Sequence, residues 1–288
     1  MPDQKLLNLL KSATEKLSRI RTEAPRLNAE RIMCSVLDCE RVDLYLEPDR
    51  TVSAGLVVQF ESLLNRRLAF EPLQYILGET EFYGFRIKCD RRALIPRPET
   101  EFVVSQAISL LENFDKLYIL DLACGTGCIG IALAHNLPQA EMTASDISQD
   151  AISLAKENVV MHNLIKRYSF HTGDLFEAVK SKGTTFDAVV CNPPYIRQGD
   201  LQSLAKQIRD HEPLKALLSG PDGLDFIRRM LKGISDVLVP GGYLVFEMGL
   251  GQAEVVNELV DATESLDFVG TVMDYSNVHR VAVARRSR

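Results

Sequence analysis

The sequence has no block of strongly basic residues. Its 288 residues carry 33 Lys and Arg against 39 Asp and Glu, and positive charge gathers only in short pairs such as Arg66-Arg67 and Arg285-Arg286. Proteins that bind nucleic acid mainly through phosphates usually show a cationic domain or stripe. The charge pattern therefore weakens the case for a DNA or RNA substrate without excluding one.

The chain also lacks a cysteine framework and an uninterrupted apolar segment. Its six cysteines include no C-x-x-C pair, which favours reduced thiols and predicts no metal site. The mostly apolar stretch 117–134 contains Asp121 and a Gly/Cys turn, so a strand, loop and helix explain it better than a membrane span. The first residues lack the apolar core of a secretory signal. We expect a cytoplasmic protein that does not contact a membrane.

Apolar residues recur at helical spacing up to residue 77. The repeats run through Leu6, Leu10, Ala13 and Leu17, through Ala29, Ile32 and Val36, and through Leu56, Phe60, Leu63, Leu64 and Leu68. Asp3, Asn28 and Ser53 stand where helix N-caps are expected. The pattern predicts a small helical domain over residues 1–77.

A connector follows over residues 78–98, where 82–87 has the pattern of a strand and Pro96 and Pro98 exclude a helix. Residues 99–288 then alternate strands with helices, which is typical of a parallel, doubly wound α/β sheet. The predicted strands are 117–122, 140–145, 168–172, 186–191 and 243–248, and two short strands at 268–273 and 280–284 fit an antiparallel pair at the sheet edge.

A glycine-rich loop follows the first of these strands, in the segment Asp121-Leu122-Ala123-Cys124-Gly125-Thr126-Gly127. Glycine lets the backbone approach a ligand, and the next helix offers its N-terminal amides. The loop also reads as G-x-G-x-x-G, with Asp146 at the distance that a dinucleotide site requires. An NAD-dependent oxidoreductase is thus one interpretation.

Three carboxylates at successive strand ends favour S-adenosylmethionine instead. Asp121 before the loop suits a cationic amino-acid cofactor and would oppose a pyrophosphate. Asp146, followed by Ile147, can bind ribose hydroxyls, and Asp174, Leu175 and Phe176 can surround an adenine. The predicted cofactor-binding set is Asp121, Ala123, Cys124, Gly125, Thr126, Gly127, Asp146, Ile147, Asp174, Leu175, Phe176 and Asn192.

The tetrapeptide Asn192-Pro193-Pro194-Tyr195 comes directly after the apolar strand 186–191. Ligands of open parallel sheets bind beyond the carboxyl ends of the strands. An amide nitrogen is a poor nucleophile because its lone pair is delocalised, so both of its N–H groups must be held. The Asn192 side-chain oxygen and the Pro193 carbonyl can accept them, while consecutive prolines fix the backbone and Tyr195 packs over the flat group. The motif predicts methylation of a planar nitrogen by positioning alone, with no general base.

These residues resemble the HemK/PrmC family of protein-(glutamine) methyltransferases. The resemblance covers nearly the whole chain and includes Gln74-Tyr75-Ile76-Leu77-Gly78, Phe82-Tyr83-Gly84, the segment 94–101, His211-Glu212-Pro213, Gly223-Leu224, and Phe246-Glu247-Met248-Gly249 with Gln252. It implies a Rossmann-like class I methyltransferase domain over 99–288 with a seven-stranded, mostly parallel sheet, a hairpin linker over 78–98 and a helical substrate-recognition domain over 1–77.

The resemblance further implies the reaction and its partners. The expected reaction transfers methyl from S-adenosylmethionine to the glutamine of the Gly-Gly-Gln motif of class I peptide chain release factors, leaving S-adenosylhomocysteine. We expect Arg97 and Glu99 to contact the substrate, and no direct nucleic-acid substrate. Besides the NAD-dependent oxidoreductase, three alternatives stay open: methylation of glutamine in a ribosomal protein, methylation of an adenine amino group in nucleic acid, and a binding module that keeps an inactive methyltransferase fold.

Overall fold

The structure is a computed structural model and describes residues 3–47, 49–180 and 185–288. The chain forms two compact units. Unit 1 contains residues 1–78 together with 205–211, and unit 2 contains residues 79–204 and 212–288. The chain therefore passes between the units at three places. Among the described residues, no helix has the length and apolar character needed to cross a membrane.

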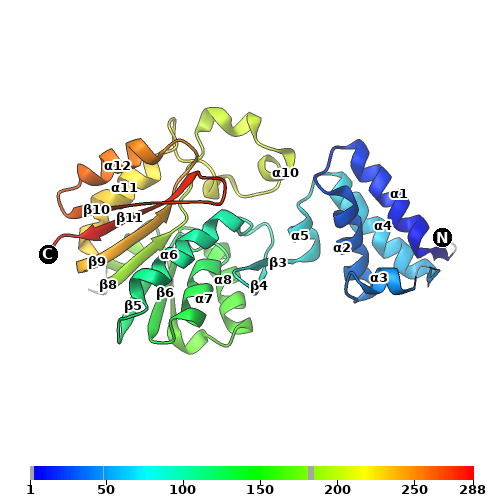
Figure 1. The fold of residues 1–288 in the computed structure, drawn as a ribbon, viewed down its shortest axis with the longest axis horizontal. Coiled ribbons are helices and arrows are strands. Elements are labelled where there is room, and N and C mark those ends of the chain that lie inside the picture. The colour runs from blue at the N-terminus through cyan, green and yellow to red at the C-terminus, as the bar shows by residue number, and fades with distance from the viewer. Residues whose placement is uncertain (1–2, 48, 181–184) are drawn as a thin grey trace. The chain divides into compact units, whose positions relative to one another are not determined.

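Unit 1 is built of short helices around one apolar core (Figure 1). Leu6, Leu17, Ile32, Phe60 and Leu64 are fully buried in that core, as the helical spacing predicts. Its elements are β1 (Gln4–Lys5), α1 (Leu6–Arg19), α2 (Pro25–Leu37), α3 (Asp43–Leu46), β2 (Thr51–Val52), α4 (Ala54–Leu68), α5 (Leu73–Leu77) and α10 (Lys206–Arg209).

The predicted helix caps of unit 1 are mostly wrong. Asn28 lies buried inside α2, where its side chain donates to the carbonyls of Glu23 and Ala24 and accepts a hydrogen bond from Arg67. Ser53 stands at the start of α4 but makes no capping bond with its side chain, and Asp3 accepts from Ala54 N there instead. Asp3 thus caps α4 and not its own helix.

The segment 205–211 joins unit 1 through specific contacts. The buried guanidinium of Arg67 donates to Gln207 Oε1 at 2.9 Å and to Glu71 O at 3.1 Å, and the ammonium of Lys206 lies 4.7 Å from the centre of the Phe70 ring. The helical periodicity of the sequence does not predict that residues 205–211 pack with unit 1, because these contacts join residues far apart in the chain.

Unit 2 carries a seven-stranded sheet in the order β10-β11-β9-β8-β5-β6-β7. Neighbours from β9 to β7 pair in parallel, whereas β11 is antiparallel to both β9 and β10, which confirms the predicted mostly parallel fold. The strands are β5 (Leu117–Leu122), β6 (Ala140–Asp146), β7 (Tyr168–Thr172), β8 (Phe186–Cys191), β9 (Leu238–Glu247), β10 (Leu266–Met273) and β11 (His279–Arg286).

Helices cover both faces of this sheet (Figure 1). On one face pack α6 (Glu101–Leu111), α7 (Cys128–Asn136) and α8 (Gln149–Met161), and on the other α9 (Glu177–Lys180), α11 (Asp225–Gly233) and α12 (Ala253–Asp261). Short 3-10 turns complete the unit: η1 (Pro98–Thr100), η2 (Ile165–Arg167), η3 (Gln198–Ser203), η4 (Leu214–Ala216) and η5 (Ile234–Asp236).

Two local predictions in unit 2 need correction. The strand that the local pattern suggested over 82–87 is instead a hairpin of β3 (Glu79–Phe82) and β4 (Phe85–Lys88), the element that the family resemblance implied here. Tyr83 and Gly84 both have positive φ, 52° and 78°, and reverse the chain. The strand expected over 243–248 begins earlier, at Leu238, so Pro240, Gly241 and Gly242 lie inside β9. There the register against β8 jumps between Phe186 and Ala188, so the strand absorbs the glycines as a bulge.

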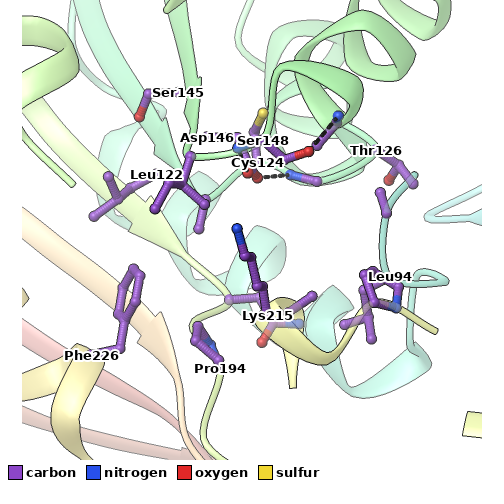
Figure 2. Close-up of a pocket in the computed structure, with 18 of the residues that line it drawn as sticks. Leu94, Leu122, Cys124, Thr126, Ser145, Asp146, Ser148, Pro194, Lys215 and Phe226 are labelled. Atoms are coloured by element: carbon purple, nitrogen blue, oxygen red, sulfur yellow. Dashed lines mark hydrogen bonds between the residues drawn. The ribbon is translucent and has the colours of Figure 1, made fainter. Parts of the chain in front are cut away.

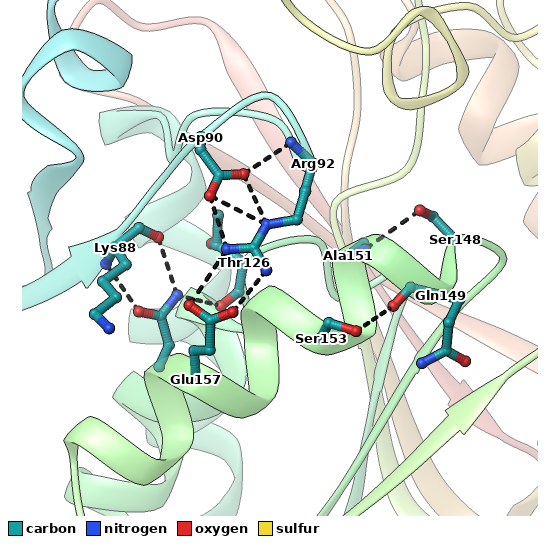
Figure 3. A network of polar contacts seen from close by, with 10 residues as sticks. Lys88, Asp90, Arg92, Thr126, Ser148, Gln149, Ala151, Ser153 and Glu157 are labelled. Atoms are coloured by element: carbon teal, nitrogen blue, oxygen red, sulfur yellow. Dashed lines mark hydrogen bonds and ion pairs between the residues drawn. The ribbon is translucent and has the colours of Figure 1, made fainter.

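The hairpin is tied to the sheet by a buried side chain of α8. Asn158, which is fully buried, accepts from Lys88 N at 2.8 Å and donates to Lys88 O and to Thr126 O. Figure 3 shows this network beside the ion pairs that Arg92 makes with Asp90 and Glu157. The connector and the glycine loop are therefore held by the same helix.

Candidate active site

The glycine loop forms a strained turn between β5 and α7. Ala123, Gly125 and Gly127 have φ of 54°, 53° and 78°, a left-handed conformation that glycine adopts without penalty. A Cβ on Gly127 would meet Ala155 Cβ at 3.2 Å, so this glycine also allows α8 to lie close. The loop is anchored by Cys124 N, which donates to Ser145 O at 3.0 Å.

Asp121 lies beneath this loop and is completely buried. Its Oδ2 accepts from Gly130 N in the first turn of α7 at 3.0 Å, and its Oδ1 has no hydrogen-bond partner among the described residues. Burial raises the pKa of Asp121 to about 8. Within the described part of the chain Asp121 is not among the residues that line the cavity at the strand ends.

Asp146 stands at the tip of β6 and does line that cavity. Its Oδ2 accepts from Gly125 N at 3.0 Å and its Oδ1 from Ser148 N at 2.9 Å. The pKa of Asp146 is raised above its usual value, because the effect of burial exceeds the opposing effect of these backbone donors. One carboxylate thus joins the glycine loop to the start of α8.

A cavity of about 570 Å³ opens beyond the carboxyl ends of β5, β6 and β8. This volume lies within the range of small-molecule sites, roughly 300 to 1,000 Å³. Figure 2 shows Cys124 and Asp146 on one side of it, with Pro194 and Lys215 on the other. The predicted site residues in its wall are Ala123, Cys124, Gly125, Thr126, Asp146, Ile147, Asp174, Leu175, Asn192 and Pro194.

The third predicted carboxylate is held by an arginine. Asp174 Oδ2 pairs with Arg229 Nη2 at 2.6 Å, and both residues line the cavity. No sequence pattern had pointed to Arg229, which comes from α11. The ring of Phe176, expected beside an adenine, instead packs in the apolar core between the sheet, α9 and α11.

The 192–195 turn is held by a buried carboxylate. Asn192 Nδ2 donates to Thr100 Oγ1 at 2.9 Å, Thr100 Oγ1 donates to Glu247 Oε2 at 2.6 Å, and Tyr195 OH donates to Glu247 Oε1 at 3.0 Å. Burial and the adjacent Glu247 raise the pKa of Tyr195, which keeps its hydroxyl protonated. Thr100 and Glu247 are 2% and 1% exposed. Sequence reasoning did not assign either residue to the site.

The backbone of the turn has its own supports. Gln252 Nε2 donates to Tyr195 O at 3.1 Å while Gln252 Oε1 accepts from Gly249 N. A Cβ on Gly223 would collide with Tyr195 O, so only glycine fits there. Gly223, Gly249 and Gln252 belong to the segments that carry the family resemblance, which was the signal that could have placed them here.

Arg97 and Glu99 do not line the cavity in the described part of the chain. Arg97 Nη2 pairs with the buried Glu212 at 2.5 Å, and the other Glu212 oxygen accepts from Ile95 N at 3.2 Å. Pro193, Tyr195 and Gly127 also lie outside the cavity wall. Glu212 therefore fixes the 95–97 segment directly before Thr100.

The thiols near the site are buried. Burial raises the pKa of Cys128 to about 12 and that of Cys124 well above its usual value, so neither is a thiolate near neutral pH. Among the described residues no three His, Cys, Asp or Glu side chains are grouped to hold a metal ion.

Comparison with known proteins gives a consistent result. Residues 8–78 match the PrmC N-terminal domain, and residues 105–211 match the methyltransferase small domain. A release factor glutamine methyltransferase of Thermodesulfovibrio yellowstonii is 37% identical over 90% of this chain and 92% of that protein. One of Chlorobaculum tepidum is 35% identical over 97% and 98%. A methyltransferase structure from Pyrococcus furiosus superposes with a TM-score of 0.51 at 15% identity, covering 80% of this chain and 98% of that one.

Proposed function

The chain belongs to the family of release factor glutamine methyltransferases, and from that premise we propose that the 192–195 turn holds the substrate amide beside an S-adenosylmethionine site. The protein is an S-adenosylmethionine-dependent enzyme that methylates a glutamine side chain of peptide chain release factors. The observation that carries the proposal is that Asn192 and Pro194 line the same cavity as Gly125 and Asp146.

The residues present suit this methyl donor, which supplies an electrophilic methyl group on a sulfonium. A Cβ placed on Gly125 would have Ala93 Cβ as its nearest neighbour, 3.8 Å away, so the backbone of the loop is open to a ligand. Asp146 presents a carboxylate that ribose hydroxyls can approach, and Asp174 and Leu175 flank the next strand end. We assign donor binding to these residues and to the 123–127 loop.

In the proposed reaction the chain contributes position rather than proton transfer. The Asn192 side-chain oxygen and the Pro193 carbonyl accept the two N–H groups of the glutamine amide, and Tyr195 packs against it. The amide nitrogen forms the new N–C bond as the S–C bond breaks. The electron pair of the broken S–C bond stays on sulfur, and one N–H proton passes to solvent. Glu247, which is bonded to Tyr195 of the turn, does not act as a base, because both of its oxygens already accept hydrogen bonds.

We further propose that the glutamine lies in the Gly-Gly-Gln motif of class I release factors, that residues 1–77 recognise the folded substrate, and that the enzyme acts in the cytoplasm without binding nucleic acid. The hairpin and proline-rich segment 78–98 then links this recognition domain to the catalytic domain 99–288. A methyl-transfer assay with release factor, ribosomal protein and DNA side by side, with the product mapped by mass spectrometry, tests the substrate. Methylation of DNA or of ribosomal protein at a rate equal to that of release factor would contradict the proposed substrate.

Asn192→Ala tests the site itself. We expect the variant to lose roughly 3 to 4 kcal/mol of transition-state stabilisation, which abolishes turnover. Its affinity for S-adenosylmethionine should stay within about tenfold of wild type. Asn136→Ala is the matched control, because that exposed asparagine at the end of α7 bonds only its own helix through Ala132 O. Asn192→Ala activity above about a tenth of wild type would mean that Asn192 only shapes the turn.

A further inference from the structure

A single buried carboxylate reaches both ends of the 192–195 turn. Glu247, the last residue of β9, accepts Thr100 Oγ1 at 2.6 Å on one oxygen and Tyr195 OH at 3.0 Å on the other. Thr100 in turn accepts Asn192 Nδ2 at 2.9 Å. The turn follows β8, and its two supports come from η1 and β9, which are far apart in the sequence.

With Glu247 as a carboxylate that accepts on both oxygens, the number of hydrogens in this chain of bonds fixes its direction. A threonine hydroxyl has one hydrogen, and Thr100 donates it to the carboxylate of Glu247. Thr100 can then only accept from Asn192, so the NH₂ group of Asn192 must face Thr100. The amide oxygen of Asn192 is left to accept a hydrogen from a group in the cavity, whose wall includes Asn192.

The opposite orientation of Asn192 is disfavoured. It would set the amide oxygen against the lone pairs of Thr100, which has no second hydrogen to give, and Thr100 is almost completely buried. A buried polar atom without a partner costs far more than a bond exchanged with water. An Asn192 turned this way would also present NH₂ to the substrate and repel the N–H groups of an amide.

Resting on the proposed role of Asn192, we propose that Thr100 and Glu247 are positioning residues that set the hydrogen-bond polarity of Asn192 and so fit the site to a substrate that donates N–H groups. The site then accepts the NH₂ of glutamine and rejects the carboxylate of glutamate, which has no hydrogen to donate. Glu247 also aligns Tyr195 through the hydroxyl of its ring. Neither Thr100 nor Glu247 takes a proton in the reaction.

Thr100→Val tests the inference, because valine keeps the shape of threonine and can neither accept nor donate. We expect kcat on release factor to fall about 10- to 100-fold, the range for one lost buried hydrogen bond. Affinity for S-adenosylmethionine, measured by calorimetry, should stay within about threefold, which also reports correct folding. Thr100→Ser should restore kcat to within about threefold of wild type, an outcome that a purely steric role would not give.

Glu247→Gln tests the polarity directly. The glutamine NH₂ can donate to Thr100, which frees the Thr100 hydrogen to face Asn192 and favours the inverted amide. We expect a loss in kcat as large as that of Thr100→Val in a variant of nearly unchanged shape. The matched control is Asp187→Asn at the opposite end of β8, where the side chain accepts from Tyr118 N, and its kcat should be unchanged.

The outcomes separate the inference from the function it rests on. An active Asn192→Ala would overturn the proposed function. An inactive Asn192→Ala together with fully active Thr100→Val would overturn only the polarity argument. If Glu247→Gln does not fold, Thr100→Val alone tests the inference. Equal losses of kcat in Thr100→Val and Thr100→Ser would also contradict the polarity argument.

Discussion

Asp146 has two tasks at the tip of β6. It faces the cavity, and it holds the glycine loop and the start of α8 through Gly125 N and Ser148 N. Replacing Asp146 should therefore affect both the proposed ribose contact and the shape of the loop.

Asp146→Ala should weaken binding of S-adenosylmethionine by roughly 1.5 to 3 kcal/mol, the range for hydrogen bonds to a charged group. Isothermal titration calorimetry measures this change. Asp150→Ala, in the exposed first turn of α8, removes the same charge nearby and should leave affinity unchanged. Unaltered affinity in Asp146→Ala would refute the ribose assignment.

Asp121 gives the unfolding free energy a pH dependence. Its pKa is about 8 in the folded protein because of burial, against an ordinary value of 3.8. Between about pH 4 and 8 the folded state therefore holds a proton that the unfolded chain has released, so this group lowers stability as the pH rises through that window.

Asp121→Asn removes that titration while keeping an acceptor for Gly130 N. Urea unfolding at about pH 5, 6.5 and 8 should show wild type losing more stability with rising pH than the variant. The other carboxylates are common to both proteins and cancel in the difference. A difference in unfolding free energy that stays constant over the three pH values would contradict the raised pKa.

At the scale of elements, the loop before α11 is shaped by its contact with the 192–195 turn. Gly223 has φ +80° and no space for a Cβ beside Tyr195 O, whereas Gly251 has φ +78° and nothing within 4 Å of the position that a Cβ would take. The two glycines share the same backbone strain and differ only in their surroundings.

Gly223→Ala should therefore lower kcat by about tenfold or more, since the turn must move to admit the methyl group. Gly251→Ala should lose about 1 kcal/mol of stability from the left-handed backbone and keep its kcat. Steady-state kinetics and thermal unfolding of both variants test this. An equal fall in kcat for both would assign the effect to backbone strain alone.

The sequence predicted the elements of unit 2 well and their supports poorly. Strands such as β5 and β8 are mostly apolar, with a glycine loop or prolines directly after them, so the local pattern is sufficient. The hairpin turn at Tyr83 depends on a non-glycine residue with positive φ, which no propensity favours. The link from Thr100 to Glu247 spans most of the catalytic domain, and no local pattern records it.

At the scale of the whole molecule, unit 1 is not a continuous stretch of chain. Deleting residues 1–77 removes Arg67 and Phe70, the partners of Gln207 and Lys206, and leaves 205–211 without its core. This segment directly precedes Glu212, which holds Arg97 and Ile95 N.

We expect the truncated enzyme to bind S-adenosylmethionine nearly normally and to methylate intact release factor with a strongly raised KM. Methylation of a short peptide with the Gly-Gly-Gln motif should change little, because such a peptide does not contact unit 1. Gln207→Ala is the control, because it removes the contact with Arg67 and leaves unit 1 in place. Equal losses on peptide and intact protein would show that residues 1–77 only stabilise the rest of the enzyme. No loss on either would refute a role of residues 1–77 in recognising the release factor.

The return of residues 205–211 to unit 1 also bears on how the protein is made. Domains generally fold in the order in which the ribosome releases them, N-terminal first. Here the helices of unit 1 emerge early, but the partner of the buried Arg67 emerges only after β5 to β8 have been synthesised. Until then Arg67 stays hydrated or bonded to Asn28 and Glu71 alone. The N-terminal unit of the nascent chain therefore completes its fold only with the return of 205–211, and its protection from protease during translation should rise in two steps.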